Sequence, residues 1–281
     1  MADFVISNGV FRSPNDVNIT IDNRSFRYGD GCFETMRVKG GKIMLEELHF
    51  DRLFSSLSRL RFDVPKSMSH AALCEQVSAL AEKNRQKLAR VRLTVYRGDG
   101  GLYDAPNLRA NYLIQTWTLD AAIPRLNENG LVLGIYREAM KVADQFSMLK
   151  SNNFLPYVMA ALYAKEQRFN DCLLLNPYGN IADATIANVF VLINGVWLTP
   201  PISDGPISGV MRKYLLEKFR AENIAYEEKS ITPEDLQRAS EVFVTNAISG
   251  IRWVAEAAGT KYERAVTSTI YSRFIKPLFS A

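Results

Sequence analysis

The chain has 281 residues, of which 47% are hydrophobic and 23% are charged, a composition typical of a globular protein with one or two domains. Its 34 basic and 30 acidic residues give a net charge of only +4 and are spread along the sequence, so we expect no nucleic-acid partner. Three separated cysteines, Cys32, Cys74 and Cys172, and only two histidines argue against a disulfide framework and against a metal site.

The sequence contains no apolar run of the ~18 residues that a membrane-spanning helix needs. Its first residues, MADFVISNGVF, also lack the basic and then apolar pattern of a signal peptide. We therefore expect a cytoplasmic protein with no membrane partner.

Residues 1–119 alternate strand and helix patterns, which predicts a smaller N-terminal α/β domain. Strands are expected at ITIDN (19–23) and in CFETMRVKGGKIML (32–45), where Gly40 and Gly41 suit a two-residue hairpin turn. The apolar spacing predicts helices over about 46–60 and 69–83, followed by strands at RVRLTVYRG (90–98) and ANYLIQTWTL (110–119).

The segment 120–129 interrupts this pattern and is predicted to connect two domains. Residues 130–281 are predicted to form a larger C-terminal α/β domain, in which Asn194 and Gly195 mark a hairpin turn. Strands are expected at 130–138, 241–246 and 251–257, and helices at about 209–222, at 232–237 and from 263 onward.

Two glycine-rich segments, YGDGCF and YRGDGG, could suggest a nucleotide site. Neither fits the spacing GxGxxG, and the chain contains no GxxxxGK[ST]. If a phosphate group binds here, it is held by neither of these loops.

Lys150 lies in SMLKSNNFL, directly before a predicted helix that Asn152 or Asn153 could cap. Lysine is seldom buried, so a lysine between an apolar pair and a helix either reaches solvent or has a chemical role. We expect one face of this helix to pack on the core, through Phe154, Leu155, Val158, Met159 and Leu162.

Other features suit pyridoxal 5'-phosphate, which needs an amine for attachment, an anion facing its ring nitrogen and donors for its phosphate. Asp183 follows an apolar segment that reads as a buried strand. Ser208 and Gly209 stand at a helix start, where backbone N–H groups bind anions. The turn in EVFVTNAISG offers further donors, and Arg52 adds a cation.

These residues resemble the class IV aminotransferases, the pyridoxal-phosphate enzymes of fold type IV, which include branched-chain and D-amino acid aminotransferases and aminodeoxychorismate lyase. The resemblance covers nearly the whole chain. It rests on seven segments in family order: RYGDGCFETMRV, ELHFDRL, VRLTVYRGDGG, LKSNNFLPYVMA, GNIADATIANVF, ISGVMR and EVFVTNAISGI. It implies a two-domain α/β (α+β) fold of the D-amino acid aminotransferase type, a cofactor-binding C-terminal domain, an active site near the domain crossing and a homodimer.

By this resemblance Lys150 is the lysine to which the cofactor is attached, and Arg52 binds its phosphate. Ile207 corresponds to the apolar residue that packs on the ring. The remaining cofactor-binding positions are the ring-nitrogen partner Asp183 and the phosphate-binding positions Val210, Met211, Asn246 and Ala247.

Two residues are candidates for binding the substrate. Phe33 lies in the first of the seven segments. Arg97 could bind a substrate carboxylate, because arginine pairs with carboxylates through two hydrogen bonds. The alternative for Arg97 is a solvated charge on a hairpin, and the sequence leaves both open.

The chain departs from the family pattern at several positions. Asp183 stands where the family usually has glutamate, one methylene longer, and Phe154 stands where many members have a tyrosine that donates to the cofactor. Met211 and Ala247 replace hydroxyl residues that are often found at the phosphate. We therefore expect the cofactor to be held less firmly than in typical members.

The leading hypothesis is an aminotransferase acting on an amino acid and a 2-oxo acid, of the branched-chain or D-amino acid type. The alternative is aminodeoxychorismate lyase, which forms 4-aminobenzoate and pyruvate in folate synthesis and to which GDGCFET, RGDGG and GVMR are similar. A third hypothesis is a catalytically impaired protein that still binds the cofactor. In either enzyme Lys150 would also act as the base that moves a proton from the substrate's Cα.

Overall fold

The computed structural model describes residues 3–123 and 125–280 and divides into two compact units. Unit 1 comprises Met1–Ile123 and Lys150–Asn153, and unit 2 comprises Pro124–Leu149 and Phe154–Ala281. The first crossing between the units lies inside the predicted connection 120–129. In contrast, Lys150–Asn153 groups with unit 1, whereas the sequence predicts it within the C-terminal domain.

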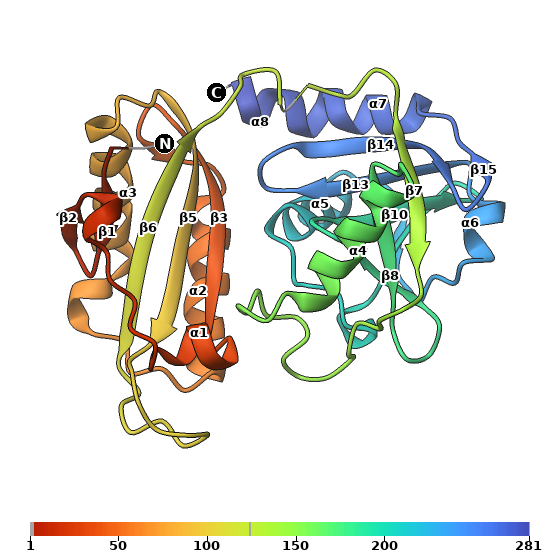
Figure 1. The fold of residues 1–281 in the computed structure, drawn as a ribbon. Helices are drawn as coiled ribbons and strands as arrows, with labels where there is room; N and C mark the ends of the chain where they lie inside the picture. The colour runs from red at the N-terminus through yellow and green to blue at the C-terminus, as the bar shows by residue number, and fades with distance from the viewer. Residues whose placement is uncertain (1–2, 124, 281) are drawn as a thin grey trace. The chain divides into compact units, whose positions relative to one another are not determined.

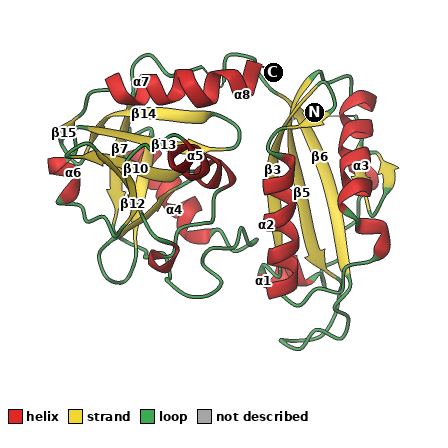
Figure 2. Ribbon diagram, turned by 180° about the vertical axis from the view of Figure 1, so that it is seen from behind, coloured by secondary structure: helices red, strands yellow, loops and turns green. Residues whose placement is uncertain are grey.

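Unit 1 is a six-stranded sheet in the order β2-β1-β6-β5-β3-β4, and Figure 2 shows helices α2 and α3 lying against the same face of it. All pairings between these strands are antiparallel. Its elements are β1 (Val5–Ser7), β2 (Val10–Arg12), α1 (Arg24–Tyr28), β3 (Gly31–Lys39), β4 (Lys42–Ile43), α2 (Glu46–Arg59), α3 (His70–Lys83), β5 (Leu88–Arg97) and β6 (Ala110–Thr118), with 3₁₀ turns at Pro14–Asp16 and Lys66–Met68.

The core of unit 1 follows the alternation of its strands. On β5, Val91, Leu93 and Val95 are fully buried together with the apolar faces of α2 and α3. The intervening positions, from Arg90 to Tyr96, point to the opposite face of the sheet, because successive side chains of a strand alternate. This opposite face is the one turned to the viewer in Figure 1.

Unit 2 contains a nine-stranded mixed sheet in the order β12-β11-β10-β13-β14-β7-β8-β9, with β15 paired to β14. Its strands are β7 (Leu131–Tyr136), β8 (Asp171–Leu175), β9 (Ile181–Ala184), β10 (Asn188–Ile193), β11 (Val196–Thr199), β12 (Tyr226–Glu228), β13 (Glu241–Asn246), β14 (Gly250–Ala257) and β15 (Thr260–Lys261). Its helices are α4 (Leu155–Glu166), α5 (Val210–Ala221), α6 (Asp235–Arg238), α7 (Ala265–Ile270) and α8 (Lys276–Ser280), with a 3₁₀ turn at Ile202–Asp204 and a π-helical turn at Tyr271–Ile275.

The sheet of unit 2 curls, because β9 at one end of the strand order is joined to β10 by only three residues. An apolar cluster inside the curl includes Leu173, Val189, Val191 and Val254. The helices α4, α5 and α7 pack on the outside of the strands (Figure 1). Among the residues that the structure describes, no helix combines the length and the apolarity needed to cross a membrane.

Both hairpin predictions are confirmed. Gly40 and Gly41 join β3 to β4 with φ of 55° and 79°, and Asn194 and Gly195 join β10 to β11 with φ of 50° and 80°. Positive φ at both central residues is the geometry whose twist matches the strands, and it favours asparagine and glycine.

The strand predicted at ITIDN is wrong. Ile19 and Ile21 are 53% and 83% exposed, so the apolar alternation has no core to bury. Instead, the side chain of Asn23 accepts hydrogen bonds from the backbone N–H groups of Ser25 and Phe26 and caps α1, a helix that the sequence analysis missed. The cap fixes the backbone of 23–26 in a helix start.

The expected core face of α4 is wrong except at Phe154, which is partly buried and packs against the core cluster of this helix. Leu155, Val158, Met159 and Leu162 are 40–70% exposed, and the helix is buried through Tyr157, Ala160 and Ala164. Its packing against β7 and β8 is made by these residues, of which the alanines let the helix approach the strands closely. The expected cap is absent as well, because Phe154 precedes the helix without a side-chain cap and Asn152 Nδ2 donates to Ser25 Oγ at 2.8 Å.

Candidate active site

Lys150 belongs to a short extended segment that pairs with the beginning of β3. The N–H of Phe33 donates to the carbonyl of Lys150, and the N–H of Asn152 donates to the carbonyl of Gly31, both at 2.9 Å. Cys32 and Ser151 face each other across this bridge. The main chain beside the lysine is therefore fixed, as an additional edge strand of the unit 1 sheet.

The side chain of Lys150 lies on the same face of the sheet as Phe33. Its Nζ is 4.4 Å from the centroid of the Phe33 ring. The guanidinium carbon of Arg92 lies 3.6 Å from the same centroid. Two of the predicted site residues, Lys150 and Phe33, are thus brought together, and the structure adds an arginine that the sequence analysis did not single out.

Arg52 is held by a buried network on the other face of β3. Its Nε and one terminal nitrogen donate to the two carboxylate oxygens of Glu34 at 2.7 and 2.6 Å. His49 Nδ1 is 2.7 Å from the same carboxylate. Because Arg52 and His49 are three residues apart on α2, one helix turn presents both to Glu34.

Charge pairing sets the protonation of this network. Burial alone would raise the pKa of Glu34, but the charge of Arg52 and the hydrogen bonds from His49 and Arg52 outweigh it and lower the pKa to about 2. Burial lowers the pKa of His49. A neutral His49 therefore donates from Nδ1 to an ionised Glu34, and its buried Nε2 has no hydrogen-bond partner among the described residues.

Asp183 lies in unit 2 on β9, a strand that is buried along its whole length. The side chain is buried, and its two carboxylate oxygens accept three hydrogen bonds. The hydroxyl of Tyr157 donates at 3.0 Å, the amide of Asn188 at 2.8 Å and the backbone N–H of Ile207 at 2.8 Å. The predicted ring-nitrogen partner and the predicted ring-packing residue, Asp183 and Ile207, are thus in direct contact.

A buried lysine stands close to this carboxylate. Lys141 donates from Nζ to the carbonyl of Ser147 at 2.8 Å and lies 5.1 Å from the ring centroid of Tyr157. Burial raises the pKa of Asp183 to about 6, although the charge of Lys141 and the three hydrogen bonds act in the opposite direction. Burial lowers the pKa of Lys141.

The helix start at Val210 and Met211 is shaped as an anion site. Gly209 precedes α5, and no side chain caps the helix, so its first N–H groups have no partner within the helix. A Cβ atom on Gly209 would lie 1.8 Å from Asn188 Oδ1, which explains why glycine stands there. The side-chain amide of Asn188 donates both to Asp183 and to the carbonyl of Ile207. Asn188 therefore links this helix start to Asp183.

The second predicted phosphate segment, Asn246 and Ala247, forms the turn between β13 and β14. Asn246 Oδ1 accepts hydrogen bonds from the N–H groups of Ile248 and Ser249 and from the Ser249 hydroxyl. The turn follows Thr245, which pairs with Asn188 on β10. Register therefore places the turn beside the Asn188 end of the Asp183 cluster.

The groups of both units have the chemistry that pyridoxal phosphate requires. Lys150 supplies the amine, Asp183 a buried carboxylate, and Arg52 and the start of α5 supply donors for a phosphate. The cofactor therefore fits the residues that are present.

The position of Phe154 differs from the family pattern in a way that the structure clarifies. Its ring stacks on Tyr157, with centroids 4.8 Å apart and an interplanar angle of 28°. Tyr157 supplies a phenol in this region, but that hydroxyl donates to Asp183.

Arg97 has a different environment from either of the two that we considered. It is buried, its Nε lies 3.0 Å from Asp30 Oδ2, and its terminal nitrogens donate to the carbonyls of Leu60 and Arg61. Its guanidinium also lies 4.2 Å from the ring centroid of Phe62. The residue is neither a solvated hairpin charge nor a donor with nitrogens to spare for a substrate, and it connects β5 to the end of α2.

Three potential metal ligands approach one another elsewhere in unit 1, although we expected no metal site. Ligand atoms of Glu46, His70 and Cys74 lie within 4.8 Å of each other. His70 Nε2 is 3.1 Å from Glu46 Oε1, and the ring of His70 packs 4.2 Å from Phe50. An ordinary hydrogen bond between the helices α2 and α3 accounts for this grouping.

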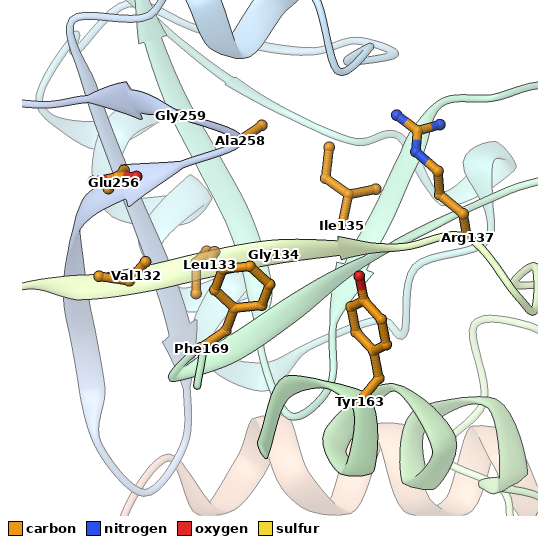
Figure 3. A pocket seen from close by; sticks show the side chains of 10 residues that line it. All are labelled: Val132, Leu133, Gly134, Ile135, Arg137, Tyr163, Phe169, Glu256, Ala258 and Gly259. Carbon is orange, nitrogen blue, oxygen red and sulfur yellow. The ribbon is translucent and has the colours of Figure 1, made fainter. Parts of the chain in front are cut away.

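A cavity of about 270 Å³ in unit 2 is separate from the residues described above. Figure 3 shows its lining by β7, by the end of β14 and by Tyr163 and Phe169. None of the predicted site residues lines it. We assign it no part in the chemistry.

Sequence reasoning missed Glu34, His49, Tyr157, Asn188 and Arg92. A usable signal existed for some of them. Glu34 occupies a core-facing position of a predicted strand, and Arg92 falls on the polar side of the alternation in RVRLTV, whereas Arg97 falls on the apolar side. The contacts of Tyr157 and Asn188 with Asp183 depend on packing and had no such signal.

Comparison with known proteins identifies the family. The sequence model of the family described as amino-transferase class IV matches residues 31–257. The chain is 29% identical over 255 residues to a protein of Methanocaldococcus jannaschii that is named, provisionally, as a branched-chain-amino-acid aminotransferase, covering 90% of this chain and 87% of that protein.

Relatives with other activities match at similar levels. Aminodeoxychorismate lyase of Vibrio harveyi is 25% identical, with 83% of this chain and 85% of that protein covered. D-alanine aminotransferase of Bacillus licheniformis is 26% identical, with 88% and 86% covered. The names of these relatives therefore leave the substrate open.

A solved structure shows the same fold. The branched-chain aminotransferase of the archaeon Thermoproteus uzoniensis with norvaline superposes with a TM-score of 0.88 at 23% identity, covering 99% of this chain and 95% of that one. The fold is therefore the two-domain α/β fold of type IV, as expected. Because the family model spans most of the sequence, from the start of β3 to the end of β14, the chain is an enzyme of the class IV aminotransferase family.

Proposed function

We propose that the protein is a pyridoxal-phosphate-dependent aminotransferase that exchanges an amino group between an amino acid and a 2-oxo acid. The observation that carries the proposal is the fixed amine of Lys150, whose main chain is bound to β3 by hydrogen bonds on both sides. Attachment of the cofactor requires an amine on a rigid segment, and Lys150 lies on such a segment, beside Phe33.

The cofactor supplies an electron sink that stabilises negative charge at the substrate's Cα when it is bound. Lys150 Nζ takes the proton from that carbon and returns it to the product, acting as base and then as acid. Asp183 would hold a proton on the ring nitrogen of the bound cofactor, while Tyr157 and Asn188 orient its carboxylate.

The cofactor's phosphate would be held by Arg52 and by the backbone N–H groups of Val210, Met211 and Ala247. Glu34 fixes the plane of the Arg52 guanidinium through two hydrogen bonds. Gly209 allows the start of α5 to lie against Asn188. The proposed phosphate donors of unit 2 are therefore held next to the residues around Asp183.

The second candidate function is that of aminodeoxychorismate lyase. It is favoured by the match to the Vibrio harveyi enzyme, which is nearly as extensive as the matches to aminotransferases. The same amine and carboxylate would serve both reactions, because both act on a substrate amino group and depend on the same cofactor. The lyase would release pyruvate and 4-aminobenzoate instead of transferring the amino group.

Assays of the purified enzyme separate these functions. Incubation with 2-oxoglutarate and a panel of amino donors, branched-chain and D-amino acids included, is expected to yield the new amino acid. Incubation with aminodeoxychorismate should yield no pyruvate. Release of pyruvate from aminodeoxychorismate without amino transfer would replace the first proposal by the second.

The role of Lys150 has its own test. Lys150→Ala should abolish both turnover and the adduct that borohydride fixes between protein and cofactor. Lys165→Ala, an exposed lysine near the end of α4, is the matched control and should behave as wild type. Full activity in Lys150→Ala would remove the basis of both candidate functions.

We also propose that the protein is a homodimer. The exposed apolar side chains of α4, Leu155, Val158, Met159 and Leu162, support this, because adjacent exposed apolar residues on one helix are typical of an association surface.

A further inference from the structure

The face of the unit 1 sheet that carries Phe33 and Lys150 also carries Arg92. Strand register pairs Arg92 with Thr35 and Thr94 with Phe33. All of these side chains lie on the side of the sheet opposite to α2 and α3, since Val91, Leu93 and Val95 fill the helix side. The arginine is therefore a neighbour of the reactive amine, within one unit of the fold.

Arg92 is held in place but has no counter-charge among the described residues. Its Nε donates to Thr94 Oγ1 at 3.1 Å, and its guanidinium carbon lies over the Phe33 ring, 3.6 Å from the ring centroid. Its terminal nitrogens donate to no described residue, and no described carboxylate forms an ion pair with it. Burial, and to a smaller extent the charge of Arg90, lowers the pKa of Arg92 and so disfavours its charged form.

A partly buried cation without an anion is costly, and an anionic ligand offsets that cost. Both Lys150 Nζ and the Arg92 guanidinium lie close to the ring of Phe33, at 4.4 Å and 3.6 Å from its centroid. The amine and the guanidinium therefore contact the same aromatic side chain. A substrate whose amino group takes the place of the Lys150 amine would carry its carboxylate one carbon away, toward groups beside that amine.

We propose that Arg92 is the residue that binds the substrate carboxylate, and that it makes the enzyme select amino acids over amines. The proposal rests on the proposed function, because it requires an amino-group substrate at Lys150. Thr94 fixes Nε, so the two terminal nitrogens remain to form a paired contact with the carboxylate. Arg97, which we first considered for this role, is already engaged by Asp30 and by two carbonyls.

The binding test uses hexanoate and hexanamide, which have the same carbon chain but differ in charge, measured by calorimetry on the holoenzyme. Wild type should bind the acid about tenfold to a hundredfold more tightly than the amide, as expected for a charge-assisted contact. Arg92→Leu should bind both equally weakly. Arg92→Gln keeps a polar side chain and is used in the same way if the leucine variant does not fold.

The matched control is Arg59→Leu, which removes the same charge from the exposed end of α2 and should keep the preference for the acid. Cofactor content is read from the visible absorbance of each variant and should not change, since Arg92 is not among its proposed ligands. An acid preference that persists in Arg92→Leu, or that is absent from wild type, overturns the assignment.

A kinetic measurement separates this inference from the proposed function. The half-reaction of the holoenzyme is followed with an amino acid and with the corresponding decarboxylated amine. In Arg92→Leu, kcat/KM for the amino acid should fall about tenfold to a hundredfold while that for the amine is unchanged. Equal losses for both would show that Arg92 only positions Phe33, and no reaction of wild type with either would count against the proposed function itself.

Discussion

Asp183 is the residue at which this chain departs most from its family pattern, and its environment shows how a shorter carboxylate is accommodated. Tyr157, Asn188 and the N–H of Ile207 hold it on β9, so both its position and its orientation are fixed. A buried carboxylate with three donors is stable only because each donor is correctly placed. The cluster is therefore adapted to aspartate.

We predict that Asp183→Asn retains the cofactor but loses most of its activity. The proposed phosphate donors and Lys150 remain, whereas the charge that by our proposal keeps the ring nitrogen protonated is lost. The measurement compares cofactor content by absorbance with the rate of exchange of the substrate's Cα proton. Normal exchange in Asp183→Asn would mean that another group faces the ring nitrogen.

Asp183→Glu asks the complementary question. The extra methylene enters a closed cluster and must displace Tyr157 or Asn188, at a cost of about 1–3 kcal/mol in stability. Activity should fall, even though glutamate is the usual residue of the family. Higher activity and unchanged stability would show that the site is not adapted to aspartate.

The raised pKa of Asp183 predicts a pH dependence of stability in the cofactor-free protein. Its folded-state pKa of about 6 exceeds the ordinary 3.8, so folding favours the protonated form. This contribution is full below pH ~4 and is lost as the pH rises to ~6, and it amounts to about 2–3 kcal/mol because one pKa unit is worth about 1.4 kcal/mol.

Urea unfolding at pH 4 and pH 6.5 tests this dependence. Asparagine imitates the neutral acid, so Asp183→Asn should gain about 2–3 kcal/mol relative to wild type between the two pH values. The exposed Asp104→Asn is the control and should show no such gain. Glu34 acts in a lower range, because its pKa of about 2 means that its contribution is lost only as the pH falls below ~4.

At the scale of elements, the start of α5 depends on the contact between Gly209 and Asn188. The φ of Gly209 is −68°, which any residue can adopt, so only space requires glycine here. The contact keeps the first turn of α5 close to the Asp183 cluster. By our proposal, Asn188 would therefore couple phosphate binding to ring-nitrogen binding.

Gly209→Ala is expected to weaken cofactor binding and to destabilise the protein by about 1–3 kcal/mol, because the new Cβ must push Asn188 aside. The dissociation constant of the cofactor and urea unfolding measure the two effects. Gly98→Ala is the control, since its Cβ would meet nothing closer than 3.7 Å. Unchanged affinity in Gly209→Ala would show that the helix start does not bind the phosphate.

For the whole molecule, the outward apolar row of α4 bears on assembly. The helix buries alanines and Tyr157 and presents its larger apolar residues to the outside, the reverse of an ordinary amphipathic helix. A second copy of the chain covering this row would explain the reversal. The homodimer proposal thus gains a specific surface.

Leu155→Glu should convert the dimer to a monomer, because Leu155 is 70% exposed in the single chain and a charge in its place would be buried on association. Light scattering coupled to size-exclusion chromatography gives the mass of each variant. Val10 on β2 is 50% exposed, and the control variant Val10→Glu should remain dimeric. A monomeric wild type would refute the proposal, and a dimeric Leu155→Glu would move the interface elsewhere.

The sequence by itself determined the features that depend on short-range physics. Gly40 with Gly41 and Asn194 with Gly195 tolerate the positive φ that a two-residue hairpin turn needs, so these pairs favour hairpins through local geometry alone. The helices over 46–60 and 69–83 follow from apolar spacing within a dozen residues. Motif order along the chain was enough to indicate the family, because each motif is local.

Only the tertiary structure decided which faces are covered and which distant segments meet. Lys150 joins unit 1 through pairing with residues more than a hundred positions away, and no local pattern records such a pairing. The sequence predicts the apolar row of α4 to be a core face, because apolar periodicity indicates that a helix face is covered. It does not indicate whether the same chain or a second copy covers that face. Arg92 and Arg97 have the same chemistry, and the packing of α2 and α3 on one face of β5 engages Arg97 with protein groups and leaves Arg92 on the side of Lys150.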